Sequence, residues 1–145
     1  MKKVFSLALM ALTVVFSACA QDRVVIFEQL PANAQKVIKQ YFTTEGIAYV
    51  KLDKEFIGTE YEVRYTNGTE IDFTDKGEIK KVDCGLNQVP EALIPEQVKN
   101  YVRENYSTSF FIKEWKLDDG YWKAELNTGL ELIFNKKYQF VGIDD

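Results

Sequence analysis

The strongest constraint on this chain is an internal match between two segments that lie about 60 residues apart. Segment 61–73 corresponds position by position to segment 122–134, and hydrophobic and polar residues alternate in both. The shorter segments 29–31 (Gln-Leu-Pro) and 88–90 (Gln-Val-Pro) show the same relationship. Self-similarity at a nearly fixed spacing predicts that one structural unit occurs twice.

Each copy of this unit is predicted to begin with an amphipathic helix. Ala34 and Ile38 lie four positions apart, on one apolar stripe of the first helix. Val98 and Val102 continue the same pattern in the second copy, where Pro95 falls in the first helical turn. The apolar stripe of each helix is therefore expected to pack on a sheet.

The period changes to two after each helix, which predicts strands. Tyr61, Val63 and Tyr65 alternate with charged residues, as in a strand with one buried and one wet face. Asn67-Gly68 follows and predicts a hairpin with a type I′ turn, because both central residues of that turn need positive φ. Thr128-Gly129 occupies the same place in the second copy. With one strand before and one after the hairpin, each copy would contain a helix and four strands.

The predicted fold class is α+β, a tandem repeat of a helix plus a four-stranded antiparallel sheet. Repeat 1 would span residues 29–85 and repeat 2 residues 88–145, preceded by an N-terminal segment at 21–28. One unit of this size buries only a small core, so the two units are expected to join side by side. We predict one composite domain with a single sheet of up to eight strands and with both helices packed on one face.

Residues 1–20 have the pattern of a secretory signal peptide and are excluded from the predicted fold. Two lysines precede an apolar run at residues 4–16, which is too short to span a membrane permanently. Two kinds of processing fit the end of this segment. Cleavage after Ala20 would release a soluble periplasmic protein, whereas the lipobox-like sequence ending at Cys19 would give a membrane-anchored lipoprotein. We expect the chain to be exported by one of these two routes.

Composition argues against several classes of function. Without residues 1–20, 16 basic residues stand against 22 acidic ones, a net charge of −6 that disfavours nucleic acid as a partner. The chain has no histidine, which removes the usual general base and the commonest transition-metal ligand. Cys84 is the only thiol left once Cys19 is removed or lipidated, so no internal disulfide is expected. We interpret Cys84 as a buried small residue and not as a reactive thiol.

Acidic pairs are the remaining candidates for catalysis or metal binding. Glu60 and Glu62, and likewise Glu70 and Asp72, alternate with core residues and are interpreted as the wet faces of strands. The sequence Asp-Asp-Gly at 118–120 is interpreted as a turn, because it lacks the ligand spacing of a calcium loop. We therefore predict no catalytic, cofactor or metal site, and no enzymatic activity.

The quoted motifs carry a family resemblance. The Leu-Pro or Val-Pro opening, the helix residues Tyr41 and Tyr101, the glycine turn, and the Glu-hydrophobic-x-Phe pattern at 70–73 and 131–134 together resemble the PepSY-like family of short secreted Gram-negative envelope proteins. The fold of that family is similar to the tandem-repeat β-lactamase-inhibitor protein. The resemblance implies secretion, two α+β repeats and no cofactor, and it suggests binding of proteins or control of peptidases.

Aromatic residues, 14% of the chain, supply the candidate binding site. The core pattern does not place Tyr49, Phe56, Trp115 and Tyr121, and a cluster of them on the sheet face away from the helices would form a hot spot for a partner. The leading hypothesis is a non-catalytic envelope protein that binds a protein or peptide through its sheet surface. The alternatives are a carrier or sensor of a small envelope ligand, bound between sheet and helices, and, third, a carboxylate-dependent hydrolase.

Overall fold

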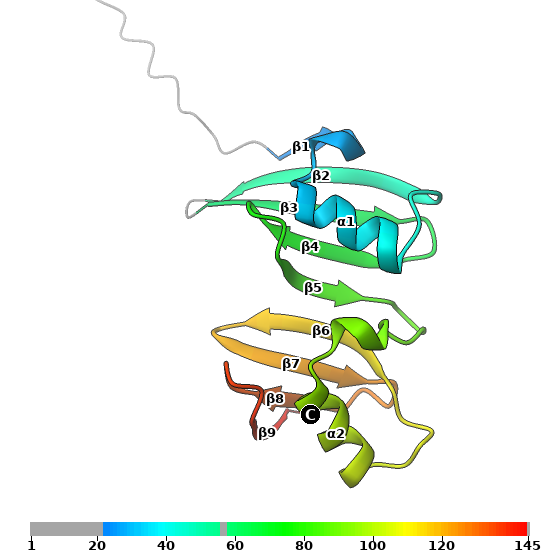
Figure 1. Cartoon of the computed structure of the whole chain (residues 1–145), viewed down its shortest axis with the longest axis vertical. Helices are drawn as coiled ribbons and strands as arrows, with labels where there is room; N and C mark the ends of the chain where they lie inside the picture. Colours follow the sequence, from blue (N-terminus) through cyan, green and yellow to red (C-terminus); the bar gives the residue numbers. More distant parts are fainter. Residues whose placement is uncertain (1–21, 56–57, 145) are drawn as a thin grey trace, which may run out of the picture.

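The computed structural model describes residues 22–55 and 58–144, in which two helices lie against one antiparallel sheet (Figure 1). The helices are α1 (Ala32–Tyr41) and α2 (Glu96–Asn105), each preceded by a short 3₁₀ helix, η1 (Phe27–Gln29) or η2 (Glu91–Leu93). The strands are β1 (Arg23–Val25), β2 (Ile47–Glu55), β3 (Gly58–Tyr65), β4 (Glu70–Thr74), β5 (Ile79–Asp83), β6 (Ile112–Asp118), β7 (Tyr121–Leu126), β8 (Glu131–Phe134) and β9 (Phe140–Asp144).

These strands form a single nine-stranded sheet in which the strand order follows the chain. The predicted tandem repeat of a helix plus four strands, with up to eight strands in total, is therefore wrong. The sheet has no break at its middle, because β5 pairs with β6 through Val82 opposite Trp115. The additional strand is β1, which the sequence interpretation left outside both copies and which pairs antiparallel with β2.

The starts of the two helices do not agree with the sequence match between segments 29–31 and 88–90. Pro31 and Pro95 each occupy the N-cap position, directly before α1 and α2. The residues before them, Leu30 and Ile94, are both buried. The proline that corresponds to Pro31 is thus Pro95 and not the proline of the segment 88–90 that the sequence match predicted. That earlier proline instead precedes η2.

Both helices cover the same face of the sheet, and the core lies between the two layers (Figure 1). As the apolar stripes predicted, Ala34 and Ile38 of α1 and Val98 and Val102 of α2 are buried. Strand residues at alternate positions form the other side of the core, because successive side chains point to opposite faces. The largest fully buried side chains among these are Phe73, Ile71, Phe134, Leu132 and Leu126.

The hairpin between β3 and β4 is confirmed, but its turn differs from the type I′ turn that was expected. The Tyr65 N–H donates to Thr69 O at 2.8 Å, and the Gly68 N–H donates to Tyr65 O at 3.1 Å. Gly68 alone in this loop has a positive φ, of 90°. A three-residue loop that ends in a left-handed glycine is the next commonest hairpin connection, and it needs no positive φ at Asn67.

The turn before the last strand of each half of the sheet is built alike, although one has Gly77 where the other has Tyr138. The Gly77 N–H donates to Thr74 O and the Tyr138 N–H to Asn135 O, both at 2.9 Å. Their φ angles are 79° and 60°. A bulky residue in this left-handed region is strained, so neighbouring contacts must hold Tyr138 there.

Candidate functional site

The helix-free face of the sheet carries charged side chains in rows that run across the strands. Because residues such as Ile71 and Val82 face the core, their neighbours in β4 and β5 face the opposite side. Six carboxylates lie directly opposite one another from β4 to β9, and we call them the acidic row. It consists of Glu70, Asp83, Glu114, Glu125, Glu131 and Asp144.

A basic row runs beside the acidic row and consists of Lys81, Lys116 and Lys123, again directly opposite one another. Like charges facing each other across strands destabilise a sheet, so the two rows must compensate each other diagonally. Lys116 Nζ lies 2.9 Å from Glu114 Oε1 and 3.0 Å from Glu131 Oε2. Lys123 Nζ also contacts Glu131, at 3.3 Å. This part of the face is therefore a lattice of ion pairs.

The ion pairs of this lattice determine whether the pKa values of its side chains are raised or lowered. Burial acts to raise the pKa of Glu131, but hydrogen bonds and charge from Lys116 and Lys123 outweigh it and lower the pKa. Burial acts to lower the pKa of Lys116, and its hydrogen bonds to Glu114 and Glu131 reverse that effect and raise it. These side chains therefore stay charged around neutral pH.

Three carboxylates gather where β3 and β4 pair. Glu62, Glu70 and Asp72 each present one oxygen, and these atoms lie within 4.8 Å of one another. It is the one such group among residues 22–55 and 58–144. Cations already lie among them: Arg64 forms ion pairs with Glu62, at 3.6 Å, and with Glu70, and Lys81 contacts Glu70 at 2.9 Å.

Glu62 has two further partners, both from β2. The Tyr49 hydroxyl donates to Glu62 Oε1 at 2.7 Å, and Lys51 Nζ lies 3.3 Å from Glu62 Oε2. Lys51 also contacts Asp53 at 3.0 Å. Its hydrogen bond to Asp53, opposed by burial and reinforced by Glu62, raises the pKa of Lys51. Glu62 is thus held by a hydroxyl and two cations at once.

Two buried carboxylate oxygens on this face lack a hydrogen-bond partner, Asp53 Oδ1 and Asp72 Oδ1. Burial raises the pKa of Asp72 to about 6; Lys81 opposes this shift, and Glu62 and Glu60 add to it. A buried acceptor without a donor costs free energy. These two oxygens are therefore the places on the face where an incoming donor or cation would gain most.

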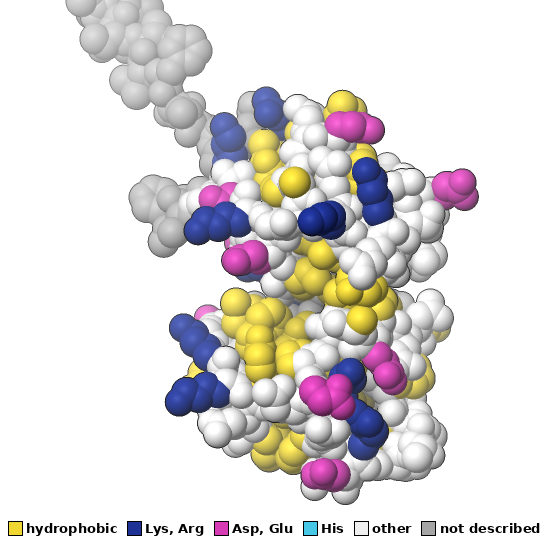
Figure 2. Space-filling view, in the orientation of Figure 1, with side chains coloured by type: hydrophobic (Ala, Val, Ile, Leu, Met, Phe, Trp, Pro, Cys, Tyr) yellow, Lys and Arg dark blue, Asp and Glu magenta, His cyan; other side chains and the backbone are white. Residues whose placement is uncertain are grey.

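On the opposite face, apolar side chains gather between the two helices, over β6 and β7 (Figure 2). The indole rings of Trp115 and Trp122 are stacked there. The ring of Tyr138 lies 6.4 Å from each of them. Trp115 is buried, whereas Trp122 and Tyr138 are half-buried. Tyr138 thus packs beside the two indoles while its backbone has a positive φ.

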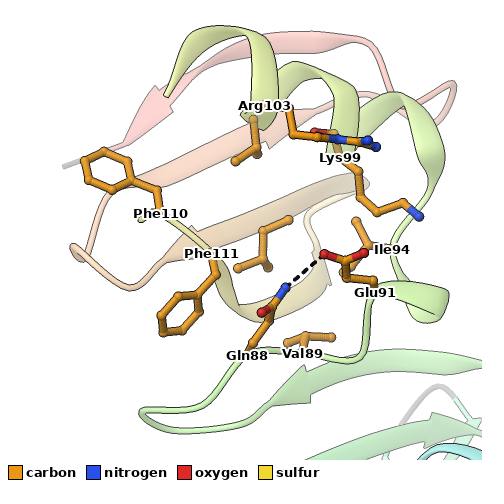
Figure 3. Close-up of a pocket in the computed structure, with 10 residues that line it drawn as sticks. Gln88, Val89, Glu91, Ile94, Lys99, Arg103, Phe110 and Phe111 are labelled. Carbon is orange, nitrogen blue, oxygen red and sulfur yellow. Dashed lines mark hydrogen bonds between the residues drawn. The ribbon is translucent and has the colours of Figure 1, made fainter. Parts of the chain in front are cut away.

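A pocket of about 80 Å³ lies between α2, η2 and the start of β6 (Figure 3). Phe110 and Phe111 stand on one side of it, and Glu91 and Ile94 on the other. Gln88 Nε2 donates to Glu91 Oε1 at 3.3 Å across its lower edge. Ligand pockets typically have ~300–1,000 Å³, so this space alone is too small for most metabolites. A neighbouring space of about 290 Å³ shares Phe110 and Phe111 with it and extends to Tyr106.

The structure separates the predicted aromatic site residues. Tyr49 in β2 and Tyr121 at the start of β7 lie on the helix-free face, with four strands, β3 to β6, between them. Trp115 belongs to the core on the other face. Phe56 and Cys19 lie outside the described residues. As contacts for a partner, all of these residues remain a prediction.

The ion-pair lattice is what the sequence interpretation missed. Alternating charges in the strands predicted a wet face, yet only the strand register shows which charges meet.

Cys84 is buried, and burial, with a smaller effect of Asp83, raises the pKa of its thiol to about 11. Among the described residues, no helix has the length and apolar character needed to cross a membrane.

Residues 59–142 match the PepSY-like family, whose description reads "putative beta-lactamase-inhibitor-like". Similar solved structures come from two species of Bacteroides. A "putative calcium-regulated periplasmic protein" from Bacteroides thetaiotaomicron is 33% identical, with a TM-score of 0.79, covering 86% of this chain and 97% of its own. A "putative periplasmic protein" of the DUF2874 family from Bacteroides vulgatus is 30% identical, with a TM-score of 0.80 and the same coverage.

A third structure, a "putative periplasmic protein of unknown function" also from Bacteroides vulgatus, is 28% identical, with a TM-score of 0.79, and covers 86% of this chain and 100% of its own. No match was found among curated proteins.

Proposed function

This chain belongs to the PepSY-like family, and from that premise we propose that it is an exported, non-catalytic binding protein of the cell envelope, which captures a protein or peptide on the helix-free face of its sheet. Periplasmic descriptions of the similar structures support export, as does the signal-peptide pattern of residues 1–20. The inhibitor-like description of the family is consistent with a partner that is an envelope enzyme or peptidase.

The observation that carries this proposal is the pair of unpartnered oxygens, Asp53 Oδ1 and Asp72 Oδ1, on an otherwise ion-paired face. In the free protein these two acceptors are desolvated and lack a hydrogen bond, which is unfavourable. A partner that supplies N–H or cationic groups there would form the missing interactions, and this gain would favour its binding. Neither helix covers this face, so a partner can reach the ion pairs around these two oxygens without moving a helix. The oxygens themselves are buried, so a partner contacts them only if neighbouring side chains on this face shift.

The chemistry of the described residues supports a non-catalytic role. A buried thiol with a pKa of about 11 supplies almost no thiolate at neutral pH, so Cys84 is a poor nucleophile. The chain has no histidine to activate a serine or threonine. Asp72 has the raised pKa of a possible acid, but one of its oxygens is buried out of reach of solvent.

Site-specific photocrosslinking in intact cells tests this proposal. A photoreactive residue at position 121, which is 45% exposed on the helix-free face, should form a discrete crosslinked complex. The same residue at position 36, on the exposed side of α1, should not. The complex should weaken in Lys116→Glu, which places a third carboxylate beside Glu114 and Glu131 and leaves Lys123 as the only cation that contacts Glu131 among the described residues. Crosslinks that form only at position 36 would contradict the proposal.

A second candidate function is a sensor of calcium, bound on the helix-free face and not between sheet and helices. Glu62, Glu70 and Asp72 bring three carboxylate oxygens together, and hard cations prefer such oxygen ligands. One similar structure is described as calcium-regulated. Against this, Arg64 and Lys81 already neutralise two of the three carboxylates, so an ion would have to displace them.

Thermal unfolding with added calcium separates the two candidates. A ligand of the folded state raises the melting temperature by mass action. If calcium binds this cluster, millimolar calcium should raise the melting temperature of the wild type and have a smaller effect on Asp72→Asn, with magnesium as the matched control ion. No difference between the two proteins would contradict calcium binding at this cluster.

A further inference from the structure

The sheet has two edges within the described chain, and they differ in how well they are protected. At one edge, β1 has only three residues, and η1 follows one residue after it. Short edge strands flanked by other elements are a common defence against pairing with another chain. At the other edge, β9 has five residues and pairs only with β8.

The side chains of β9 are unusually apolar for an edge strand. Phe140, Val141 and Ile143 are 37%, 54% and 50% exposed. No lysine, arginine or proline interrupts the strand, although natural edges usually carry such residues. The register shift at this end of the sheet makes Val141 an extra residue in the pairing with β8, and that residue is itself exposed and apolar. Such a bulge gives an edge partial protection, but β9 has no lysine, arginine or proline and its apolar side chains stay exposed, so another strand can still pair with it.

Charges at the two ends of β9 indicate which strand fits. Lys136 and Lys137 are exposed in the turn before β9, and Asp144 is exposed at its C-terminal end. None of the three takes part in an ion pair within the described residues. Read along the chain, the edge is therefore basic, then apolar, then acidic. A strand that pairs antiparallel with it would need the same order, so the edge is complementary to itself.

We propose that β9 pairs antiparallel with β9 of a second copy of this chain, giving a two-fold dimer with one continuous sheet. The interface would be isologous, with Phe140 and Val141 of both copies at its centre, Ile143 within it, and Lys137 of each copy opposite Asp144 of the other. The dimer does not depend on the proposed function. It would, however, place two helix-free faces side by side in one sheet of twice nine strands.

Light scattering coupled to size-exclusion chromatography, or sedimentation equilibrium, tests the dimer over a range of concentrations. A single five-residue strand makes a small interface, so we expect the dimer to be weak. The fraction of dimer should rise as the protein concentration is raised to about 1 mM. Ile143→Lys should shift the protein to monomer, because it places a charge within the interface, close to Lys137 of the other copy. The matched control is Val24→Lys on the β1 edge, which should leave the dimer unchanged, with circular dichroism to check folding of both variants.

A charge swap tests the antiparallel arrangement itself. Lys137→Glu alone and Asp144→Lys alone should each weaken the dimer, because each places like charges opposite one another. The double variant should restore it, and mixing the two single variants should give a heterodimer. A wild type that stays monomeric at about 1 mM, or a dimer lost in Val24→Lys and kept in Ile143→Lys, would overturn the proposal.

Discussion

The indole rings of Trp115 and Trp122 lie parallel, with their centroids 4.8 Å apart and their planes at 6° to each other. The two residues come from neighbouring strands and lie diagonally, since Trp115 is opposite Ala124 and Trp122 is opposite Leu117. The stack covers the part of the sheet between the helices, and its inner ring, Trp115, is only 3% exposed. Trp115 therefore packs on the core in the region between the helices, which neither helix covers.

Replacing Trp115 with alanine should lower the free energy of unfolding by about 3–5 kcal/mol, the usual cost of emptying the site of a buried aromatic side chain. Trp122→Ala should cost less, because Trp122 is only half-buried. Urea denaturation measures both values. Equal losses would show that the two rings contribute alike, contrary to their burial. Loss of partner binding in Trp115→Ala would be ambiguous, so Tyr121 is the better aromatic for a surface test.

Gly77→Ala should destabilise the protein more than Gly68→Ala, although both glycines have positive φ. A Cβ at Gly77 would lie 2.7 Å from the backbone nitrogen of Ala34 in α1, whereas a Cβ at Gly68 would meet nothing within 4 Å. Gly68→Ala thus carries only backbone strain, about 1 kcal/mol. Chemical denaturation of both variants gives the comparison. A smaller loss for Gly77→Ala would contradict the close approach of α1 to this turn.

Local patterns in the sequence were enough to locate several elements. The stripe through Ala34 and Ile38 placed α1, and the alternation in segment 61–73 placed β3 and β4, because each depends on residues a few positions apart. β1 escaped detection, since Arg23-Val24-Val25 is too short to show alternation and is a strand only because β2 lies beside it. The continuity of the sheet at Val82 and Trp115 likewise depends on a pairing that no local pattern encodes.

The candidate site was less accessible to sequence reasoning. Alternating charges predicted a wet face, but burial of Asp72 depends on what surrounds it in space. Asp72 lies opposite both Glu62 and Lys81, one like charge and one opposite charge. The strand register and the side-chain positions decide which neighbour has the larger effect on the pKa of Asp72. They also decide whether its oxygens accept hydrogen bonds. Trp115 shows the converse, an aromatic residue that the pattern left unplaced and that packing draws into the core.

Tyr65→Phe should lower the free energy of unfolding by about 1 kcal/mol, since the Tyr65 hydroxyl donates to Thr43 O at 2.8 Å just after α1 and would leave that carbonyl without this donor. Burial of the hydroxyl raises its pKa to about 12, so it remains a donor at any pH where the protein is studied. Tyr121→Phe is the control, because Tyr121 is exposed. Equal stability of the two variants would mean that this hydrogen bond contributes nothing.

Cys84 should react slowly with a thiol reagent in the folded protein. Its pKa of about 11, against a reference of 9.0, lowers the thiolate fraction at pH 8 roughly 100-fold, and burial hinders access further. The measurement compares Ellman's reagent with folded and urea-unfolded protein beginning at Gln21, which contains no other cysteine. Rapid labelling under native conditions would show that the thiol is accessible.

Asp72 should make the protein less stable as pH rises from about 4 to about 6. Its folded pKa of about 6 exceeds the reference value of 3.8, so within this window the folded state holds a proton that the unfolded state has lost. The unfolding free energy then falls with increasing pH, by up to about 3 kcal/mol for a shift of about two pKa units. Below the reference value both states are protonated, and this contribution to the slope vanishes.

Asp72→Asn should therefore be more stable than the wild type at pH 7, by about 1–3 kcal/mol, because it no longer buries a charge. It should also lose most of the pH dependence between about 4 and about 6. Asp118→Asn is the matched control: Asp118 is exposed, and its hydrogen bond with Lys123 lowers its pKa, so that substitution should keep the slope. Urea titrations at several pH values measure these differences. If Asp72→Asn keeps the wild-type dependence of the unfolding free energy on pH, the charge of Asp72 is stabilised on this face. Asp72 would then no longer be a desolvated acceptor that supports binding of a partner there.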